Sequence, residues 1–548
     1  MAAPRCSFTA AFVLLCAVAG VGAAASNDTC AYAEWALEDA LMEDGLCAHV
    51  FATGLDKPRG IWPVHGSGCL LVLERGRGRI VALHDDDGDG RADATSVIAT
   101  QPGVNHGLAV RSHLPVTHLF LVKLTPTPNN TESDVPPAHR ARQVHGGYVY
   151  ASSDTTVWRW PYRAGQRTTS LDDSKEVVVR DMNADGRGGA PGGHTTRTLA
   201  FDATGRLYVS VGSYSNVDAD SHRSRIRRFT VLTEGGDTAV PVGGFDFQND
   251  GELFADGLRN EVGLAFDAHG VLWGVENGAD NLHRADLGGD IHDEHPAEEL
   301  NAFHEDDVGK HWGYPYCWTQ FGEDLAGPGV GASKGTSWAW PSFMNDGVHT
   351  DAWCRANTVP PRVAMQAHSA PLGLAFYDAS VATKKCPKGQ NNKTALPANM
   401  DGDAFVGYHG SWNRSPPTGH KVVRVPMTSA GAVESGGGIA DASPIDVMKN
   451  GKGEGARWAN GLRPVDVRFD ACGHILVSDD GPGGYIVMIT GKAGNRTDNN
   501  GRAQTGGKRA TDPTPGLATS GAPRRLVFEL VLTFVIWCLS SNVRRVLA

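Results

Sequence analysis

The sequence predicts an all-β fold, a six-bladed β-propeller around a central polar pocket. Three segments repeat one pattern, in which a Phe-Asp pair and a glycine turn lead into an alternating apolar strand: 201–210, 266–275 and 469–478. The first two begin 65 residues apart, and the third begins 203 residues later, close to three such units. This period suits a four-stranded blade with long loops, so the roughly 440 residues of 51–490 hold about six blades.

The first 50 residues precede this domain. Residues 1–25 combine a basic residue, an apolar run and small residues, which is typical of a secretory signal. The mature protein is therefore expected to be secreted or extracellular. Residues 26–50 form an N-terminal segment, with a short helical pattern at 32–42. Five Asn-x-Ser/Thr sites agree with a secreted glycoprotein: Asn27, Asn129, Asn392, Asn413 and Asn495.

Two segments follow the predicted domain. Residues 491–523 are rich in Gly, Thr, Asn and Pro and predict a flexible linker. Residues 524–548 are mainly apolar but short and interrupted by Glu529, so a cleaved lipid-anchor signal and a marginal membrane helix are both open. Either alternative predicts attachment at a membrane surface.

Charge and cysteine content exclude some classes of partner and site. The formal net charge is −11, and no Lys/Arg block lies in the predicted domain, which argues against nucleic acid. Of ten cysteines, two lie in the signal and one in the tail; the remaining seven contain no Cys-x-x-Cys pair. Disulfides are therefore favoured over a zinc or redox site. Proximity predicts Cys30–Cys47 and Cys317–Cys354, and the odd count leaves one thiol unexplained.

Polar residues precede the predicted innermost strands. A propeller directs the head of each such strand toward one axis, so these residues should converge. Alone, His194 is more often a structural histidine than a catalyst, but six segments deliver imidazoles or cations: 105–107 with His106, His194 with Arg197, Arg259 with Asn260, His368 with Ser369, 409–414 with His409 and Arg414, and Arg463. Such a pocket suits a compact polyanion.

Two regions carry calcium signals. The first is the turn at 275–282 together with the acidic stretch 290–301, where carboxylates and free carbonyls suit Ca²⁺, although a solvated acidic loop is the alternative. The second is the loop 85–93, whose spacing resembles the opening of an EF-hand loop. Its candidate ligands are Asp85, Asp87, Asp89 and Asp93, and Ser96 stands where the usual Glu would be. We expect this second ion to be structural.

Several separated motifs resemble the glucose/sorbosone dehydrogenases, most closely the sorbosone or pyranose dehydrogenase branch. The matching segments run from about 51 to 489 and are Gly193–Arg197, Gly257–Glu261, Glu276–Gly278, His311–Tyr316, Gly410–Arg414 and Gly461–Pro464. The resemblance implies a six-bladed propeller that holds pyrroloquinoline quinone and Ca²⁺.

Matched position by position, the resemblance also implies roles for individual residues. His194 matches the general base, and Arg259, Asn260 and Arg463 match cofactor contacts. Gly278 and Ala279 match the turn whose carbonyls hold the catalytic Ca²⁺. The family's cofactor lysine and second arginine have no clear counterparts.

The charge of the cofactor indicates how those missing groups are replaced. Its three carboxylates suit the three arginines Arg259, Arg414 and Arg463, so Arg414 is expected to supply the missing charge. His106, Arg197 and His409 are expected to complete the cofactor site.

The leading hypothesis is therefore an oxidoreductase that passes hydride from a sugar to the quinone and then to an unidentified electron acceptor. The main alternative is a secreted or membrane-anchored propeller that binds a ligand without catalysis. A calcium-dependent hydrolase is a third possibility, but it would place carboxylates around the axial ion. The presence of His194, Arg259, Asn260 and Arg463 at the matched positions favours the enzyme hypothesis over the ligand-binding one.

Overall fold

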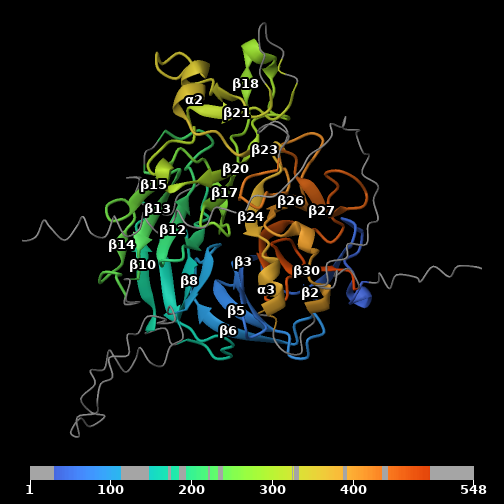
Figure 1. The fold of residues 1–548 in the computed structure, drawn as a ribbon. Helices are drawn as coiled ribbons and strands as arrows, with labels where there is room; N and C mark the ends of the chain where they lie inside the picture. Colours follow the sequence, from blue (N-terminus) through green and yellow to red (C-terminus); the bar gives the residue numbers. More distant parts are fainter. Residues whose placement is uncertain are drawn as a thin grey trace, which may run out of the picture. The chain divides into compact units, whose positions relative to one another are not determined.

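The computed structural model describes residues 30–112, 147–170, 174–183, 193–219, 222–232, 238–323, 325, 333–384, 386, 392–434 and 442–493. Within them, six antiparallel four-stranded sheets follow one another around a ring, two of them with an added edge strand, which confirms the predicted six-bladed propeller (Figure 1). The predicted signal, the tail and nearly all of the predicted linker lie outside the described residues. No helix among the described residues is long and apolar enough to cross a membrane.

The first three blades are built from consecutive strands. Blade 1 comprises β3 (Pro58–Val64), β4 (Cys69–Glu74), β5 (Arg79–His84) and β6 (Ala94–Thr100). Blade 2 comprises β7 (Leu108–Ser112), β8 (Gly147–Ser152), β9 (Val157–Pro161) and β10 (Glu176–Arg180), with β14 (Phe245–Asp246) added in parallel. Blade 3 comprises β11 (Leu199–Phe201), β12 (Arg206–Val211), β13 (Arg225–Thr230) and β15 (Glu252–Asp256).

The last three blades complete the ring. Blade 4 comprises β16 (Glu261–Phe266), β17 (Leu272–Glu276), β20 (Glu298–Phe303) and β23 (Val363–Met365). Blade 5 comprises β24 (Pro371–Phe376), β25 (Ala404–Tyr408), β26 (Lys421–Val425) and β27 (Ile445–Asn450), with β1 (Ala40–Met42) at its edge. Blade 6 comprises β28 (Pro464–Phe469), β29 (Ile475–Asp479), β30 (Ile486–Gly491) and β2 (Leu46–Ala52).

The repeated Phe-Asp pattern forms the turn between the first two strands of a blade. In blade 3, the Asp202 carboxylate accepts hydrogen bonds from the Arg206 backbone N–H at 2.9 Å and from the Thr204 hydroxyl at 2.8 Å. Gly205 supplies the left-handed φ of 91° that this turn requires. Asp267 and Asp470 accept the corresponding backbone N–H groups in blades 4 and 6.

The core consists of apolar layers between neighbouring blades, one for each of the six interfaces. Strand β4 shows how a strand serves two layers. Leu71 and Leu73 pack against blade 2, whereas Leu70 and Val72 pack against blade 6. Because both faces are buried, β4 is a continuous apolar run instead of an alternating one.

Pairing of an N-terminal strand with the last blade closes the ring. Strand β2 lies antiparallel to β30, with Ala48 opposite Ile489, so the propeller begins before the boundary predicted at residue 51. The helix predicted at 32–42 is wrong: the segment holds a single 3₁₀ turn, η1 (Ala33–Trp35), and the strand β1. Pairing of Ala40–Met42 with the edge of blade 5 outweighs the weak local helical preference.

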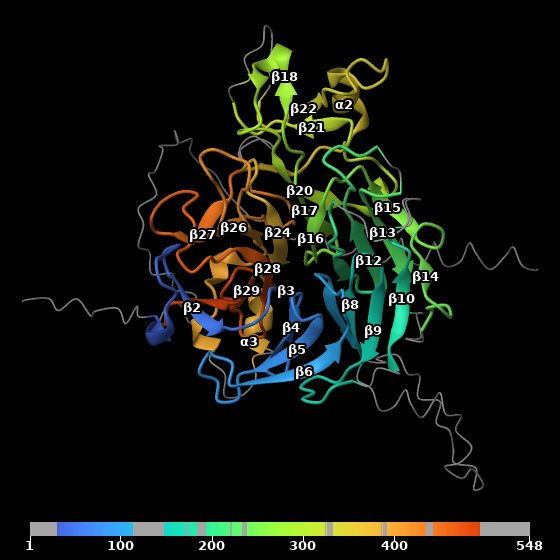
Figure 2. The ribbon, with the colours of Figure 1, turned by 180° about the vertical axis from the view of Figure 1, so that it is seen from behind.

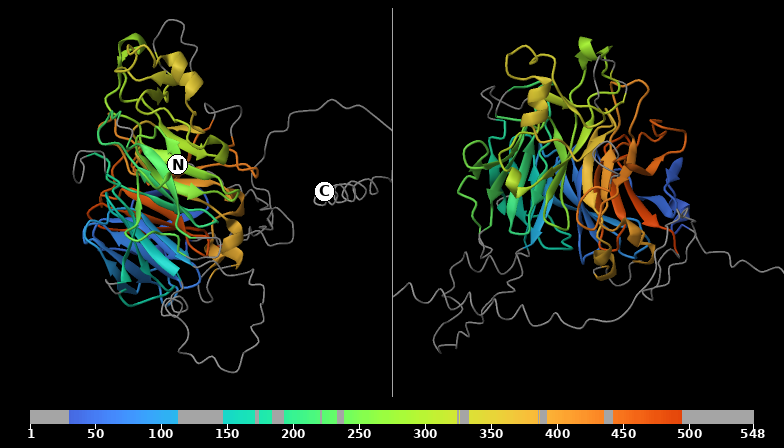
Figure 3. Two further views of the ribbon diagram at one scale, coloured as in Figure 1. Left: turned by 90° about the vertical axis from the view of Figure 1, so that its left-hand side faces the viewer. Right: turned by 45° about the horizontal axis from the view of Figure 1, so that its top comes forward.

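Two long insertions in blade 4 form a small cap beside the ring (Figures 1 to 3). The cap contains β18 (His283–Arg284), β19 (Gly289–Asp290), β21 (Cys317–Thr319), β22 (Ser337–Ala339) and α2 (Asp351–Asn357). Its own core is rich in tryptophan and includes Ala279, Trp318 and Trp338. The remaining short elements are α3 (Ala379–Lys384) and the 3₁₀ turns η4 (Ala285–Leu287), η5 (Glu305–Asp307), η6 (Asn392–Thr394) and η7 (Ala398–Met400).

Both predicted disulfides, Cys30–Cys47 and Cys317–Cys354, are confirmed. A third joins Cys386 to Cys472, 86 residues apart, which proximity in sequence could not indicate. The odd thiol is the buried Cys69.

We expect Phe51→Ala in the closing strand to lower the free energy of unfolding by about 3 to 5 kcal/mol. Phe51 is 4% exposed and packs with Leu476 and Ile486 at the joint between blades 6 and 1. Leu41→Ala on β1 is the control, because Leu41 is 52% exposed and should change stability by less than about 0.5 kcal/mol. Denaturant titration measures both, and equal effects would contradict the closure role.

Candidate active site at the mouth of the propeller

The innermost strands β3, β7, β11, β16, β24 and β28 contact one another in sequence around the axis. Each begins at the end where the second strand of its blade finishes, because the two are antiparallel. We call this end the mouth. The predicted residues that precede these strands lie there: His106, His194, Arg197, Arg259, Asn260, His368 and Arg463.

The predicted correspondence of one segment to each blade is wrong in two places. His409 follows the second strand of blade 5, β25, whereas His368 precedes the first strand of that same blade. Blade 1 contributes Arg59, the second residue of β3, which is not among the predicted residues. The basic residue in Lys57-Pro58-Arg59 was the available signal.

His194 is held by both its ring and its backbone. Its Nδ1 lies 2.9 Å from Ser213 Oγ and 3.1 Å from Ser213 O. The Ser213 hydroxyl donates to Ser215 O at 2.7 Å, so Nδ1 carries the proton that it donates to Ser213. The Nε2 lone pair is then available, and no described residue makes a hydrogen bond to it.

Two buried arginines fix the backbone of His194. Arg197 and Arg223 each donate to the His194 carbonyl at 2.9 Å. Arg197 is fully buried, and its other donors bind Asp154 O, Thr196 O and Asn183 Oδ1. Arg197 therefore supports His194 from behind. Arg223 was not predicted, because nothing in the sequence distinguishes it from the other arginines.

The electrostatic surroundings keep His194 neutral. Burial, and then the positive charges of Arg259, Arg223 and Arg197, lower the pKa of His194 to about 3, against the single opposing effect of the Ser213 carbonyl. Desolvation and like charges both disfavour the imidazolium. At neutral pH the ring is therefore an available proton acceptor.

Arg259 connects the mouth to the turn that the resemblance assigned to calcium. Its guanidinium donates to Asn216, to Asp280 Oδ2 at 3.0 Å and to Gly278 O at 2.6 Å. A calcium ion at the carbonyls of Gly278 and Ala279 would have to share or displace that hydrogen bond. Asn260, the next residue, donates to Asn277 Oδ1 at 3.2 Å, which places it against the same turn.

Acidic residues lie behind this turn in blade 4. Glu261, Glu276 and Glu299 stand directly opposite one another across β16, β17 and β20, all buried, around the Asn301 amide at 3.4 to 3.5 Å. Burial raises the pKa of each, that of Glu299 to about 7. Like charges opposite one another across a sheet are destabilising, so this cluster favours cations or protons. The acidic stretch at 290–301 is visible in the sequence, but the pairing that sets these three glutamates opposite one another is not.

A second network joins blades 5, 6 and 1. Asp480 accepts from Arg59 at 2.6 Å and from His409 at 2.8 Å, and these partners hold the pKa of Asp480 well below its usual range despite its burial. Arg463 donates to the carbonyls of His409 and Gly410 at 3.1 and 3.0 Å. The basic side chains of blades 1, 5 and 6 (Arg59, His409 and Arg463) are thus held in place through Asp480 and backbone carbonyls.

Several buried polar atoms at the mouth have no hydrogen-bond partner among the described residues. They are His106 Nδ1, Arg59 Nε, Ser369 Oγ, Asn413 Oδ1 and Arg414 Nε. Arg414 pairs with Glu294 and donates to Ala367 O, and Asn413 donates to Asp280. Unpartnered polar atoms, most of them able to donate, beside several arginines fit a ligand that carries carboxylates and hydrogen-bonding ring atoms.

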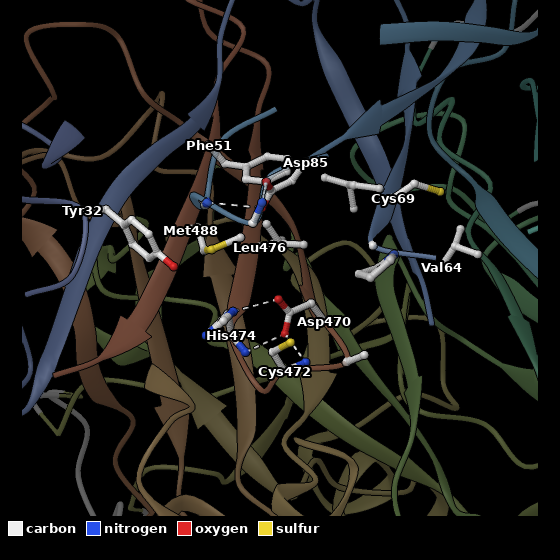
Figure 4. A pocket seen from close by; sticks show the side chains of 16 residues that line it. Tyr32, Phe51, Val64, Cys69, Asp85, Asp470, Cys472, His474, Leu476 and Met488 are labelled. Atoms are coloured by element: carbon white, nitrogen blue, oxygen red, sulfur yellow. Dashed lines mark hydrogen bonds and ion pairs between the residues drawn. The ribbon is translucent and has the colours of Figure 1, made fainter. Parts of the chain in front are cut away.

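The predicted calcium loop lies away from these residues, between the outer strands β5 and β6. Ligand oxygens of Asp85, Asp87 and Asp89 lie within 4.8 Å of one another. Asp93 is apart from this group and accepts the Asp86 backbone N–H at 2.7 Å, which closes the loop. Asp85 also lines a cavity of about 50 Å³ with Tyr32, Asp470 and His474 (Figure 4).

Comparison with known proteins assigns the chain to a family. A family model described as TrAA12-like matches residues 139–492. The chain belongs to the TrAA12-like family. The pyrroloquinoline quinone-dependent sugar dehydrogenase of Hypocrea jecorina (strain QM6a) is 31% identical over 352 residues, which are 61% of this chain and 69% of that relative.

Further relatives extend the match over more of this TrAA12-like chain. The pyrroloquinoline quinone-dependent pyranose dehydrogenase of Coprinopsis cinerea is 29% identical over 467 residues, 80% of this chain, but the match spans only about half, 53%, of that relative. The holo form of its PQQ domain has a TM-score of 0.63 and 27% identity, covering 82% of this chain and 97% of the domain. A calcium structure of Trichoderma reesei family AA12 has a TM-score of 0.63 and 26% identity, covering 82% and 96%.

We expect Asp87→Ala to reduce the stabilisation that Ca²⁺ confers without changing ligand binding at the mouth. A Ca²⁺ concentration of about 100 times Kd stabilises a one-site protein by about 2.7 kcal/mol, and the variant should lose most of that gain. Melting temperature with and without Ca²⁺ measures it, and Glu38→Ala, an exposed acid outside the loop, is the control. Unchanged calcium stabilisation would remove the assignment of this loop.

Proposed function

We propose that this protein is a pyrroloquinoline quinone- and calcium-dependent dehydrogenase that oxidises a pyranose sugar at a hydroxyl-bearing or hydrated aldehyde carbon. The observation that carries the proposal is His194, a neutral histidine whose tautomer and backbone are both fixed among three arginines. A ligand-binding propeller without catalysis has no need of a base prepared in this way. The activities named for the TrAA12-like relatives support the same conclusion.

The residues present fit the quinone. Arg259, Arg414 and Arg463 approach from blades 4, 5 and 6, and the unpartnered donors of Arg59 and Ser369 lie near them. Guanidinium groups bind carboxylates with two parallel hydrogen bonds, so this set can hold a tricarboxylate. Bound there, the quinone would supply the two-electron oxidant for the sugar.

Within this proposal, His194 accepts the proton of the reacting sugar hydroxyl at Nε2. Its Nδ1–H continues to donate a hydrogen bond to Ser213, so the ring keeps its orientation as it becomes charged. The arginines that lower the pKa of His194 also make the imidazolium unstable. His194 therefore releases that proton to solvent readily. Residues of the chain thereby supply a base that is ready at neutral pH and regenerates without help.

Calcium at the Gly278 and Ala279 carbonyls forms the other part of the proposal. Glu298 accepts the Gly278 backbone N–H at 2.8 Å, and the acidic cluster of Glu261, Glu276 and Glu299 lies behind the turn, so a cation there is electrostatically favoured. Arg259 opposes it through its hydrogen bond to Gly278 O. Binding of an anionic cofactor by Arg259 would release that carbonyl, which couples the two binding events.

The three disulfides support an oxidising compartment, and we propose that the protein acts outside the cell. Turnover also requires an electron acceptor that reoxidises the quinone. The decisive experiment mixes the full chain with quinone and Ca²⁺ and measures sugar-dependent reduction of an artificial dye. Binding of quinone without any dye reduction across aldoses and ketoses would favour the ligand-binding alternative.

We expect His194→Ala to lower kcat by roughly 10²- to 10⁴-fold, the usual contribution of a positioned base. Quinone and Ca²⁺ should bind nearly as in the parent, because the cationic groups remain. His269→Ala, an exposed histidine on the turn after β16, is the matched control and should keep full turnover. Full turnover in folded His194→Ala would refute the base while leaving the dehydrogenase reading intact.

The pH dependence of kcat/KM tests the surroundings of His194. With its pKa lowered to about 3, His194 should be neutral throughout pH 5 to 8, so the parent should show no acid limb from this group in that range. Ser213→Asp places a carboxylate at Nδ1 and favours the imidazolium, so an acid limb should move up into the measured range. Ser215→Asp puts the same charge on an exposed neighbour and should shift it far less. Identical profiles for the two variants would contradict the assigned contact.

A further inference from the structure

A cavity of about 250 Å³ lies beside the mouth, between the loop after β25 and the segment before β28. Arg463, which also faces the mouth, forms one wall, and Arg457 forms another. Ser411 and Trp412 border it from blade 5. Arg463 is therefore shared between this cavity and the mouth.

The charges that line this cavity are all positive. No carboxylate belongs to its lining, and each of the two arginines disfavours the charge of the other or of the nearby His420. No described residue pairs with the Arg457 guanidinium, which is exposed. Arg463 uses Nε and Nη2 on backbone carbonyls and has Nη1 left over. Two cations without an intervening acid form a site for an anion.

Two acids near Arg463 favour its charged form, but neither forms an ion pair with its guanidinium among the described residues. Asp480 is engaged by Arg59 and His409. Asp479 accepts the backbone N–H groups of Arg463 and Gly481. Neither carboxylate contacts the guanidinium of Arg457 or Arg463 among the described residues, so the side chain of Arg457 is left for a ligand.

The remaining walls suit a sugar ring. Trp412 is 73% exposed, an unusual position for so large an apolar ring, and it offers a flat surface to the apolar face of a pyranose. His420 is 3% exposed, and neither of its ring nitrogens has a hydrogen-bond partner among the described residues. Its ring lies against Gly410, where a Cβ would come within 2.2 Å of it. A buried imidazole without partners indicates that hydroxyl groups from a ligand satisfy it.

We propose that this cavity binds a carboxylate-bearing pyranose, a uronic acid, with the carboxylate between Arg457 and Arg463 and the ring against Trp412. The inference rests on the proposed function, because it names the class of sugar presented to His194. It distinguishes acidic sugars from their neutral counterparts, which lack a charge for Arg457. A carboxylate of the quinone is the competing occupant.

The test compares glucuronate with glucose, two sugars that differ only at C6, using the full chain with quinone and Ca²⁺. The parent should favour glucuronate in kcat/KM by at least tenfold. Arg457→Ala should remove that preference by raising KM for glucuronate, by roughly 10- to 100-fold, the loss of one charge-assisted hydrogen bond, with glucose unaffected. Lys452→Ala, a nearby cation paired with Asp39 outside the cavity, should leave the preference unchanged.

Four results would overturn the proposal. The first is equal use of glucuronate and glucose by the parent, and the second is an unchanged preference in Arg457→Ala. The third is weakened quinone binding in Arg457→Ala with an unchanged preference, which would assign the cavity to the cofactor. Equal preference for glucose 6-sulfate would likewise refute a carboxylate-specific site.

A direct binding arm separates this proposal from the proposed function. Glucuronate is titrated calorimetrically into the cofactor-free chain and into Arg457→Ala. Binding to the parent that is lost in the variant supports the site even if no sugar is oxidised. Absence of glucuronate binding in a preparation that does oxidise glucose refutes the site and leaves the dehydrogenase standing.

Discussion

The pairing of β2 with β30 is the constraint on which the rest of the structure depends. His194 belongs to blade 3 and Arg463 to blade 6, so only a closed ring holds them at a fixed separation. Each interface between blades is one apolar layer, and opening any one would displace every blade beyond it. A site assembled from six segments therefore inherits the rigidity of the whole ring, as a preorganised site requires.

Charge is distributed unevenly within this ring. Arginines at the mouth are braced by backbone carbonyls more than by carboxylates, as Arg197 and Arg463 illustrate. A carbonyl orients a guanidinium without cancelling its charge, so the mouth stays positive and keeps His194 neutral. Blade 4 does the opposite, because its opposed glutamates, whose pKa values are raised by burial, favour a cation or protons behind the Gly278 turn. Arg259 lies between the two regions.

The sequence was sufficient for the features that a repeat encodes. The Phe-Asp turn recurs because each blade needs the same tight connection, and it predicts the blade number and the heads of the inner strands. It could not predict contacts set by register between distant segments. Ser213 is 19 residues from His194, and Glu261 faces Glu276 only once β16 and β17 are paired. Arg223 and the Cys386–Cys472 disulfide likewise have no local signal, and the helix predicted at 32–42 was lost to an edge-strand pairing.

Arg259 also determines how the site must respond to its ligands. While Arg259 binds Asp280 and Gly278 O, the Gly278 carbonyl already has a cationic partner, the Arg259 guanidinium. Under the proposed function, a cofactor carboxylate would compete for the same guanidinium, and each hydrogen bond that it took would make Gly278 O more available to calcium. Anion and metal should therefore bind with positive coupling, and by reciprocity calcium should tighten the quinone by the same factor. Under the proposed function, cofactor and metal would thus form one thermodynamic unit instead of two independent sites.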